Sequence, residues 1–194
     1  MDTPEGSQRQ SAGGAGPLHG IWHFSFTVAD IERSIRFYRD LLGFELVHEQ
    51  EQQNAYTSQL VGYANAHLKV AQFAVPGQPR GLSSHDLELV EYVNPRGTRG
   101  DTNICNPGAA HLAICVDDIQ DRYEMLHSAG VQFNSPPTAI TAGVNVGGFT
   151  CYFRDPDQIV LEMVQPPARR LANGQTAASN KSSSNAEGVV KESL

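Results

Sequence analysis

Long apolar runs, a surplus of positive charge and paired cysteines are all missing from this chain of 194 residues. No apolar stretch approaches the roughly 20 residues that cross a membrane, and the first residues lack the basic start and apolar core of a signal peptide. Three cysteines are an odd number without the spacing of a disulfide framework. Lys and Arg number 14 against 21 Asp and Glu, a net charge of −7, which argues against a nucleic-acid-binding surface. We therefore expect a cytoplasmic protein with reduced thiols, and neither nucleic acid nor a membrane as its partner.

A strand, a tight turn and a helix are predicted for residues 20–44, GIWHFSFTVADIERSIRFYRDLLGF. On the strand, an apolar set alternates with a second set that contains His23. Asp30 is placed to cap the helix, and Gly43 is placed to end it. The apolar set consists of Trp22, Phe24, Phe26 and Val28. Because the helix is expected to pack on this set, His23 should point to the opposite face of the sheet.

The same pattern recurs at residues 110–131, AHLAICVDDIQDRYEMLHSAGV. His111 takes the place of His23, 88 residues later (111 − 23 = 88). Each half also ends in a similar strand, LELV at 87–90 and LEMV at 161–164. A repeat of this length indicates a duplicated structural unit. Each copy carries one His and one Glu, and together they supply His23, Glu88, His111 and Glu162.

The two copies resemble the βαβββ modules of the vicinal oxygen chelate superfamily, which includes glyoxalase I, methylmalonyl-CoA epimerase, extradiol dioxygenases and bleomycin-resistance proteins. The matching words are HFSFTVADIERSIRFYRDLLGF, LELVEYVNPRG, HLAICVDDI with SAGVQF, and YFRDPDQIVLEMVQ. The resemblance implies an α+β fold in which two modules form a paired, partly open mixed β-barrel with a metal site inside. Gln158 stands where the family usually has glycine after DPD, so we expect a changed turn there.

The repeat and the composition together divide the chain. We expect the first module at residues 18–93, a linker at 94–109 and the second module at 110–167. Residues 1–17 and 168–194 have too little apolar content to join a core and are predicted to be disordered. Residues 50–66 lack a clean period and are predicted to form a mobile loop over the site.

Two imidazoles and two carboxylates form a ligand set that suits Zn, Fe, Mn, Co or Ni, and its lack of thiolate argues against a purely structural zinc site. Strand alternation predicts that Glu88 and Glu162 lie opposite their leucine and methionine neighbours. A carboxylate in the middle of such a strand is costly unless it is paired or metal-bound. We therefore predict one divalent metal ion, held by His23, Glu88, His111 and Glu162.

Three neighbouring side chains compete for roles in this site. Glu91 falls on the other face of its strand and is expected to be solvated. His85 could lie at the rim of the site or behind a ligand, but an exposed histidine at the start of a strand is the preferred interpretation. Cys115 shares a face with His111 and is expected to be a buried, inert thiol.

The resemblance implies that a substrate binds the metal through neighbouring oxygens. A cation polarises a carbonyl and lowers the pKa of the adjacent C–H, and a nearby carboxylate can then move the proton. Glu162 and Glu88 are the predicted catalytic residues, on opposite sides of the substrate. Glu162 is favoured as the base because it resembles the residue in that role in glyoxalases. The leading hypothesis is a metal-dependent epimerase or isomerase, or a glyoxalase-like lyase, acting on a keto-sugar or cyclitol of the valiolone type, an acyl-CoA or a hydroxyketone.

Two other functions stay open. An Fe(II)-dependent extradiol-type dioxygenase typically uses two His and one carboxylate, so a second glutamate counts against it. A non-catalytic small-molecule-binding resistance protein usually lacks the complete ligand set. The family is often dimeric and each module leaves strand edges to cover, so we expect a homodimer. Whether the four ligands come from one chain or two is left open.

Overall fold

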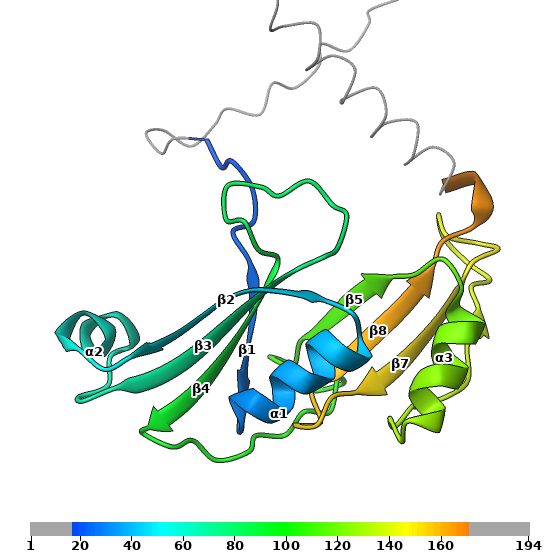
Figure 1. Cartoon of the computed structure of the whole chain (residues 1–194). Helices are drawn as coiled ribbons and strands as arrows, with labels where there is room; N and C mark the ends of the chain where they lie inside the picture. Colours follow the sequence, from blue (N-terminus) through cyan, green and yellow to red (C-terminus); the bar gives the residue numbers. More distant parts are fainter. Residues whose placement is uncertain (1–16, 171–194) are drawn as a thin grey trace, which may run out of the picture.

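The computed structural model describes residues 17–170, so the disorder predicted for 1–17 and 168–194 concerns segments that lie almost entirely outside the described residues. Within the described residues, eight strands form two mixed four-stranded sheets (Figure 1). The first has the order β1-β4-β3-β2 and the second the order β5-β8-β7-β6. The strands are β1 (Phe24–Val28), β2 (Glu45–Gln52), β3 (His67–Ala74), β4 (Leu87–Asn94), β5 (His111–Cys115), β6 (Thr138–Ala139), β7 (Phe149–Arg154) and β8 (Val160–Gln165). In each sheet the first strand pairs in parallel with the last, and the other pairs are antiparallel. The expected pair of βαβββ modules is confirmed, and neither sheet closes on itself.

Each module places its first helix directly after its first strand, as the caps predict. Asp30 accepts a hydrogen bond from the backbone N–H of Arg33 at the start of α1 (Ile31–Ile35). Asp118 likewise caps α3 (Ile119–Ser128), where it accepts from the backbone N–H groups of Gln120 and Asp121. Gly43 and Gly130 follow the helical segments with φ of 83° and 85°, the left-handed conformation that glycine adopts at no steric cost. One feature differs from the prediction. The helix after β1 continues as a π-helix, η1 (Arg36–Leu41), which brings both Phe37 and Tyr38 into the core.

One local prediction is wrong. The loop predicted at residues 50–66 contains the end of β2 and a helix, α2 (Ala55–Val61). Asn54 caps that helix by accepting from the N–H of Thr57, and Gly62 ends it with φ of 75°. Outside the named strands, Phe133 forms a single antiparallel bridge with Phe153.

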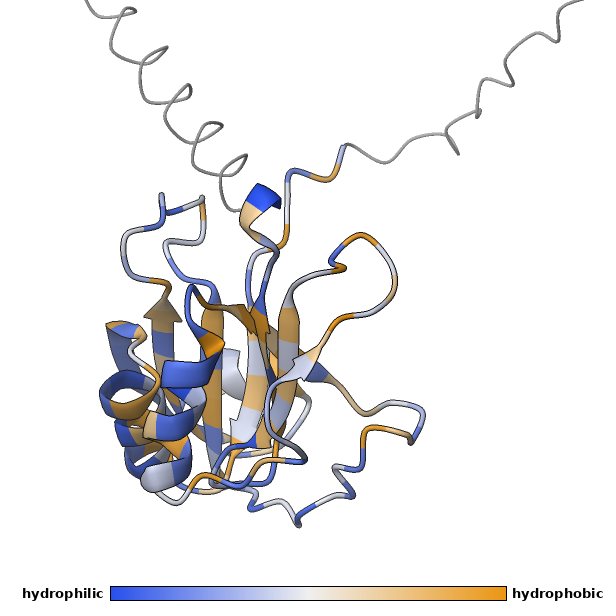
Figure 2. Cartoon of the chain, turned by 90° about the vertical axis from the view of Figure 1, so that its right-hand side faces the viewer, coloured by the Kyte–Doolittle hydropathy of each residue, from blue (hydrophilic) through white to orange (hydrophobic). Residues whose placement is uncertain are grey.

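The two modules share one hydrophobic core, which contains buried residues from both sheets and from α1, η1 and α3. Figures 1 and 2 show α1 and α3 on the same side of the two sheets. Polar contacts also join the modules. The hydroxyl of Tyr38 donates to Asp155 at 3.1 Å, and Arg33 forms an ion pair with Asp157 at 2.6 Å. The helices cover and bury one face of each sheet. Glu88 and Glu162 each lie on the other face of their sheet, away from the helices.

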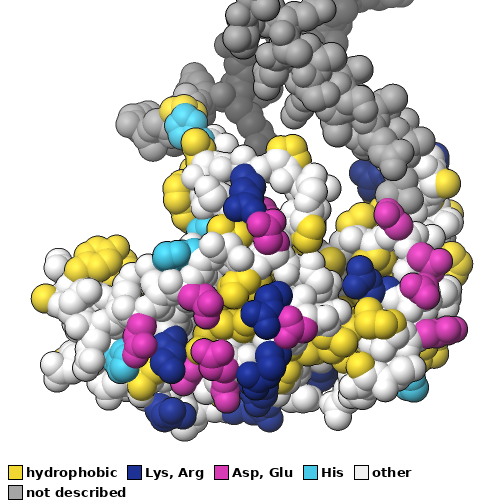
Figure 3. Space-filling view, viewed as in Figure 1, with side chains coloured by type: hydrophobic (Ala, Val, Ile, Leu, Met, Phe, Trp, Pro, Cys, Tyr) yellow, Lys and Arg dark blue, Asp and Glu magenta, His cyan; other side chains and the backbone are white. Residues whose placement is uncertain are grey.

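The face that carries the helices is a mixed-charge surface. Figure 3 shows Lys and Arg side chains interspersed with Asp and Glu over it. Such a mixture is typical of a solvated surface rather than of one that binds nucleic acid. Within residues 17–170, no helix combines the length and the apolar character that a membrane crossing needs.

Candidate metal centre

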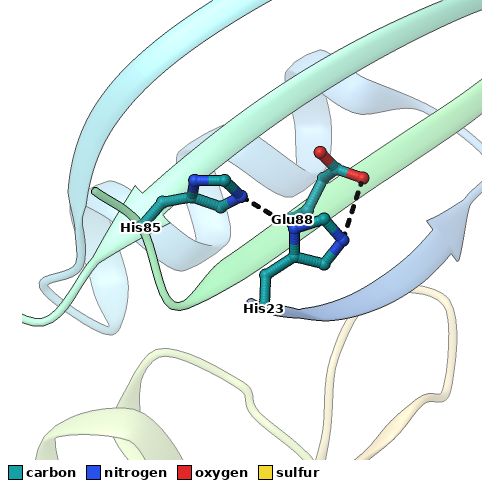
Figure 4. Close-up of side chains that lie close together, drawn as sticks. All are labelled: His23, His85 and Glu88. Carbon is teal, nitrogen blue, oxygen red and sulfur yellow. Dashed lines mark hydrogen bonds and ion pairs between the residues drawn. The ribbon is translucent and has the colours of Figure 1, made fainter. Parts of the chain in front are cut away.

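The first predicted His–Glu pair forms where β1 and β4 run in parallel. His23 directly precedes β1, and Glu88 is the second residue of β4, level with Ser25. Nε2 of His23 lies 3.6 Å from Oε1 of Glu88 (Figure 4). Both side chains are largely shielded from solvent. Gln72 stands opposite Glu88 on β3 and donates from Nε2 to Oε2 at 3.1 Å. One carboxylate oxygen is thus held by an amide, and the other faces the imidazole.

The second pair repeats this arrangement in the other sheet. His111 begins β5, and Glu162 lies on β8, level with Ala113. Nε2 of His111 is 3.2 Å from Oε2 of Glu162, while Oε1 accepts from the hydroxyl of Thr150 at 2.6 Å. The same imidazole nitrogen therefore faces a carboxylate in both modules, and in both modules the other carboxylate oxygen is held by a neutral donor.

The spacing within each pair fits two ligands of one cation. Metal–ligand bonds of 2.0–2.2 Å place adjacent N and O ligands roughly 2.8–3.6 Å apart in tetrahedral or octahedral geometry. The observed separations of 3.6 Å and 3.2 Å lie within this range. Imidazole and carboxylate donors suit Zn, Fe, Mn, Co or Ni. His23 with Glu88, and His111 with Glu162, are the residues that could hold such an ion.

In the single chain the four predicted ligands form two half-sites rather than one cluster. Within residues 17–170, the only group of three or more His, Cys, Asp or Glu with ligand atoms all within 4.8 Å of one another is His23, His85 and Glu88. Two ligands of one ion can be at most about 4.4 Å apart, which is twice the longest of these bonds. His111 and Glu162 therefore stand apart from the first pair.

His85 belongs to the first half-site, although the preferred interpretation from the sequence was an exposed histidine. His85 is buried, with only 5% of its surface exposed. Nε2 of His85 lies 2.9 Å from Nδ1 of His23, and its own Nδ1 lies 2.7 Å from the carbonyl oxygen of Ser83. The parallel pairing of Phe24 with Leu87, and the hydrogen bond from the N–H of Phe24 to the carbonyl oxygen of Asp86, bring the segment just before β4 alongside His23.

Two further expectations are wrong. Glu91 is buried, 8% exposed, and accepts a hydrogen bond from the backbone N–H of Ile31 at 2.9 Å. It therefore supports the first turn of α1 instead of facing solvent. Cys115 is exposed. It lies on β5 in line with His111, on a face that no other part of the described chain covers well enough to bury it.

Two side chains close to Glu162, the thiol of Cys151 and the phenol of Tyr152, stay protonated near neutral pH. Burial and, second, the charge of Glu162 raise the pKa of Cys151 to about 11. The same two causes raise the pKa of Tyr152, which stands opposite Glu162 on β7. In the metal-free protein Cys151 is therefore a thiol near neutral pH, and the phenol of Tyr152 remains a hydrogen-bond donor. The ring of Tyr152 packs edge-on to His111, with centroids 5.3 Å apart.

A family model described as the Glyoxalase/Bleomycin resistance protein/Dioxygenase superfamily matches residues 20–163. The chain belongs to this superfamily. This confirms the resemblance to vicinal oxygen chelate proteins and covers both modules, including all four predicted ligands.

Its relatives include enzymes at low identity. A 2-epi-5-epi-valiolone epimerase from Actinomyces sp. is 30% identical over 160 residues, which are 80% of this chain and 84% of that protein. A probable lactoylglutathione lyase from Synechocystis sp. is 25% identical over 151 residues, 77% of this chain and 98% of that protein. Among solved structures, a glyoxalase family protein from Bacillus cereus matches with a TM-score of 0.67 at 16% identity, over 81% of this chain and 100% of that one. This last likeness supports the fold.

Proposed function

We propose that this protein is a divalent-metal-dependent epimerase or isomerase that moves a proton at a carbon beside a chelated carbonyl. The repeated His–Glu pair carries the proposal. In each module an imidazole Nε2 faces a carboxylate at 3.6 Å or 3.2 Å, and each carboxylate keeps one oxygen toward the imidazole. Two carboxylates are what a proton transfer between opposite faces of a carbon needs. The valiolone epimerase relative favours a cyclic polyhydroxy ketone, which offers neighbouring oxygens for chelation.

The metal, when bound, would polarise the substrate carbonyl and stabilise negative charge on its oxygen. His23 and His111 are positioned to hold it through Nε2. Glu162 is proposed to take the proton from the adjacent carbon. Thr150 binds Oε1 of Glu162, which orients the carboxylate and leaves Oε2 for this role. Glu88, oriented by Gln72, is proposed to return the proton on the opposite face or to remain a ligand.

We propose that the complete site forms between two copies of the chain. Each copy presents two half-sites on the sheet faces opposite its helices, and β5 leaves His111, Ala113 and Cys115 exposed on that face. An isologous two-fold dimer would bring the first pair of each copy against the second pair of its partner, and would so create two equivalent sites. The expected homodimer thus becomes a requirement for metal binding.

The test is exchange of the substrate proton with heavy water, followed by proton NMR across hydroxyketones, keto-cyclitols and acyl-CoAs. Glu162→Gln keeps the size and one ligand oxygen but removes the base. We expect this variant to retain its metal while exchange falls by about 10²–10⁴-fold, the range for a lost acid–base group. Glu124→Gln, at an exposed position on α3, is the matched control. Exchange at the wild-type rate in both Glu162→Gln and Glu88→Gln would place the base elsewhere.

A glyoxalase-like lyase is the second candidate, since relatives named lactoylglutathione lyase also match the chain. It uses the same proton transfer on a hemithioacetal, so including that compound in the panel separates the two activities. Oxygen consumption with Fe(II) and a catechol, in place of proton exchange, would favour the dioxygenase. Tight binding of a small molecule without metal and without exchange would favour the resistance protein.

A further inference from the structure

We propose that His85 is a positioning residue, which fixes the orientation and the tautomer of His23 so that Nε2 of His23 carries the free lone pair. This inference deepens the proposed function, since that lone pair is what the metal needs. It assigns to His85 a role that neither the repeat nor the four-ligand set includes.

The hydrogen-bond partners assign the protons along a short chain of groups. The carbonyl oxygen of Ser83 can only accept, so Nδ1 of His85, 2.7 Å away, must carry a hydrogen. Nε2 of the neutral His85 ring is then an acceptor, and it lies 2.9 Å from Nδ1 of His23. Nδ1 of His23 therefore carries the hydrogen of this contact. In a neutral imidazole the other nitrogen is then unprotonated, and this is the nitrogen that faces Glu88.

The two contacts of His23 use different ring nitrogens, Nδ1 toward His85 and Nε2 toward Glu88, so His23 can bind an ion on only one of these two sides. Figure 4 shows His85 beside one nitrogen of His23 and Glu88 beside the other. One imidazole binds one ion through one nitrogen. The second module indicates which nitrogen of His23 binds the ion, because His111 also presents Nε2 to its carboxylate. His85 therefore supports the ring from the side away from the proposed metal.

The second module has no histidine at this place. The offset between the two glutamates is 74 (162 − 88), and the residue 74 positions after His85 is Ile159. The ring of His111 packs against Tyr152 instead, and its side chain is 41% exposed against 27% for His23. The first histidine is thus held in place before metal binds, and the second has more freedom.

Two conservative variants of the full chain separate this role from simple packing. In His85→Gln the amide oxygen can reach the place of Nε2 and accept from His23. In His85→Asn the shorter amide reaches only the place of Nδ1, so Ser83 keeps its donor and His23 loses its acceptor. We expect zinc affinity, measured by competition with a chelator, to fall about 10–100-fold in His85→Asn, the range for lost second-shell partners, and to stay near wild type in His85→Gln. His48→Asn, at an exposed position on β2, is the control.

Nitrogen-15 NMR of the metal-free protein gives the readout that does not depend on metal. The proposal predicts the Nδ1–H tautomer of His23 in the wild type and in His85→Gln, and a mixture in His85→Asn. An Nε2–H tautomer or a doubly protonated His85 in the wild type, or equal zinc affinity in the Asn and Gln variants, would overturn it. A wild-type protein that binds no zinc would instead refute the proposed function, while the tautomer result would still decide the role of His85.

Discussion

The two modules repeat their backbone and their ligand pairs but not the contacts that surround them. Ser84 and Gln158 both adopt the left-handed conformation, with φ of 62° and 67°, four residues before Glu88 and Glu162 respectively. Glu91 and Gln165, three residues after those glutamates, each accept the N–H of the first helical residue. All three pairs share one offset (158 − 84 = 162 − 88 = 165 − 91 = 74). The repeat thus conserves the entry to the strand, the ligand and the support of the helix.

The differences lie in the side chains that orient the site. An amide, Gln72, holds the first glutamate, whereas a hydroxyl, Thr150, holds the second. A buried histidine supports His23, and an aromatic ring packs against His111. The two equivalent histidines are therefore positioned differently. His23 is held firmly by a hydrogen bond, and His111 is held more loosely by ring packing.

Removing one imidazole from either half should have the largest effect. His23→Ala and His111→Ala should each weaken metal binding by more than the roughly 100-fold upper end of second-shell changes, because a ligand itself is lost. Metal content by mass spectrometry checks this, with His48→Ala as the exposed control. Near-full occupancy in either ligand variant would remove that half from the site.

The junction between the modules should respond to pH through Asp155. Its carboxylate is buried, accepts from Tyr38 and from the N–H groups of Asp157 and Ile159, and burial raises its pKa to about 6 against a usual 3.8. Because the folded pKa is raised, the folded state binds the proton more tightly, and this stabilisation is present at low pH and is lost as pH rises from about 4 to 6. The first module has Gly81 at the equivalent position (155 − 74 = 81) and lacks this group.

Asp155→Asn removes the titration while keeping an acceptor for the two N–H groups. Between about pH 4 and pH 6, the free energy of unfolding of the variant should rise relative to wild type by up to about 3 kcal/mol, since one pKa unit corresponds to about 1.4 kcal/mol. Denaturant unfolding at several pH values measures the difference. Asp117→Asn, at an exposed position, should show no such trend. A constant difference across this range would contradict the raised pKa.

The two helix supports should differ in strength, because one is a buried carboxylate and the other an amide. Glu91→Ala should cost about 1–3 kcal/mol of stability, since it removes a charged acceptor and leaves the buried N–H of Ile31 unpaired. Gln165→Ala should cost about 0.5–1.5 kcal/mol, as a neutral hydrogen bond is lost. Thermal and denaturant unfolding of the two variants compare them. Equal losses would show that the charge of Glu91 adds nothing.

The smallest effect is expected at the two left-handed turns. Gln158 stands where the family usually has glycine, and it adopts the left-handed conformation that glycine favours. Gln158→Gly and Ser84→Gly should each stabilise by about 0–1 kcal/mol, because relief of about 1–2 kcal/mol of strain is partly offset by the entropy of glycine in the unfolded chain. Destabilisation in either unfolding experiment would show that the side chain contributes more than the strain costs.

Local patterns predicted most of the fold but little of the environment of the site. Alternation placed Glu88 and Glu162 on the right faces, and Asp30 and Asp118 marked the two helix starts. The burial of His85 depends on how residues 80–86 fold against β1, which no local pattern encodes. The π-helix at 36–41 and the capped helix at 55–61 were missed because packing and a short polar segment hide the helical period. The separation of the two His–Glu pairs depends on how whole modules pack.

Subunit complementation tests the shared metal site most directly. One chain carries His23→Ala with Glu88→Ala, and the other carries His111→Ala with Glu162→Ala. Each alone should bind almost no metal. Co-expressed as a mixed dimer, they restore one intact site, so we predict about one metal ion per two chains, half the wild-type content. A mixed dimer that forms but remains without metal would show that the two pairs do not meet across copies.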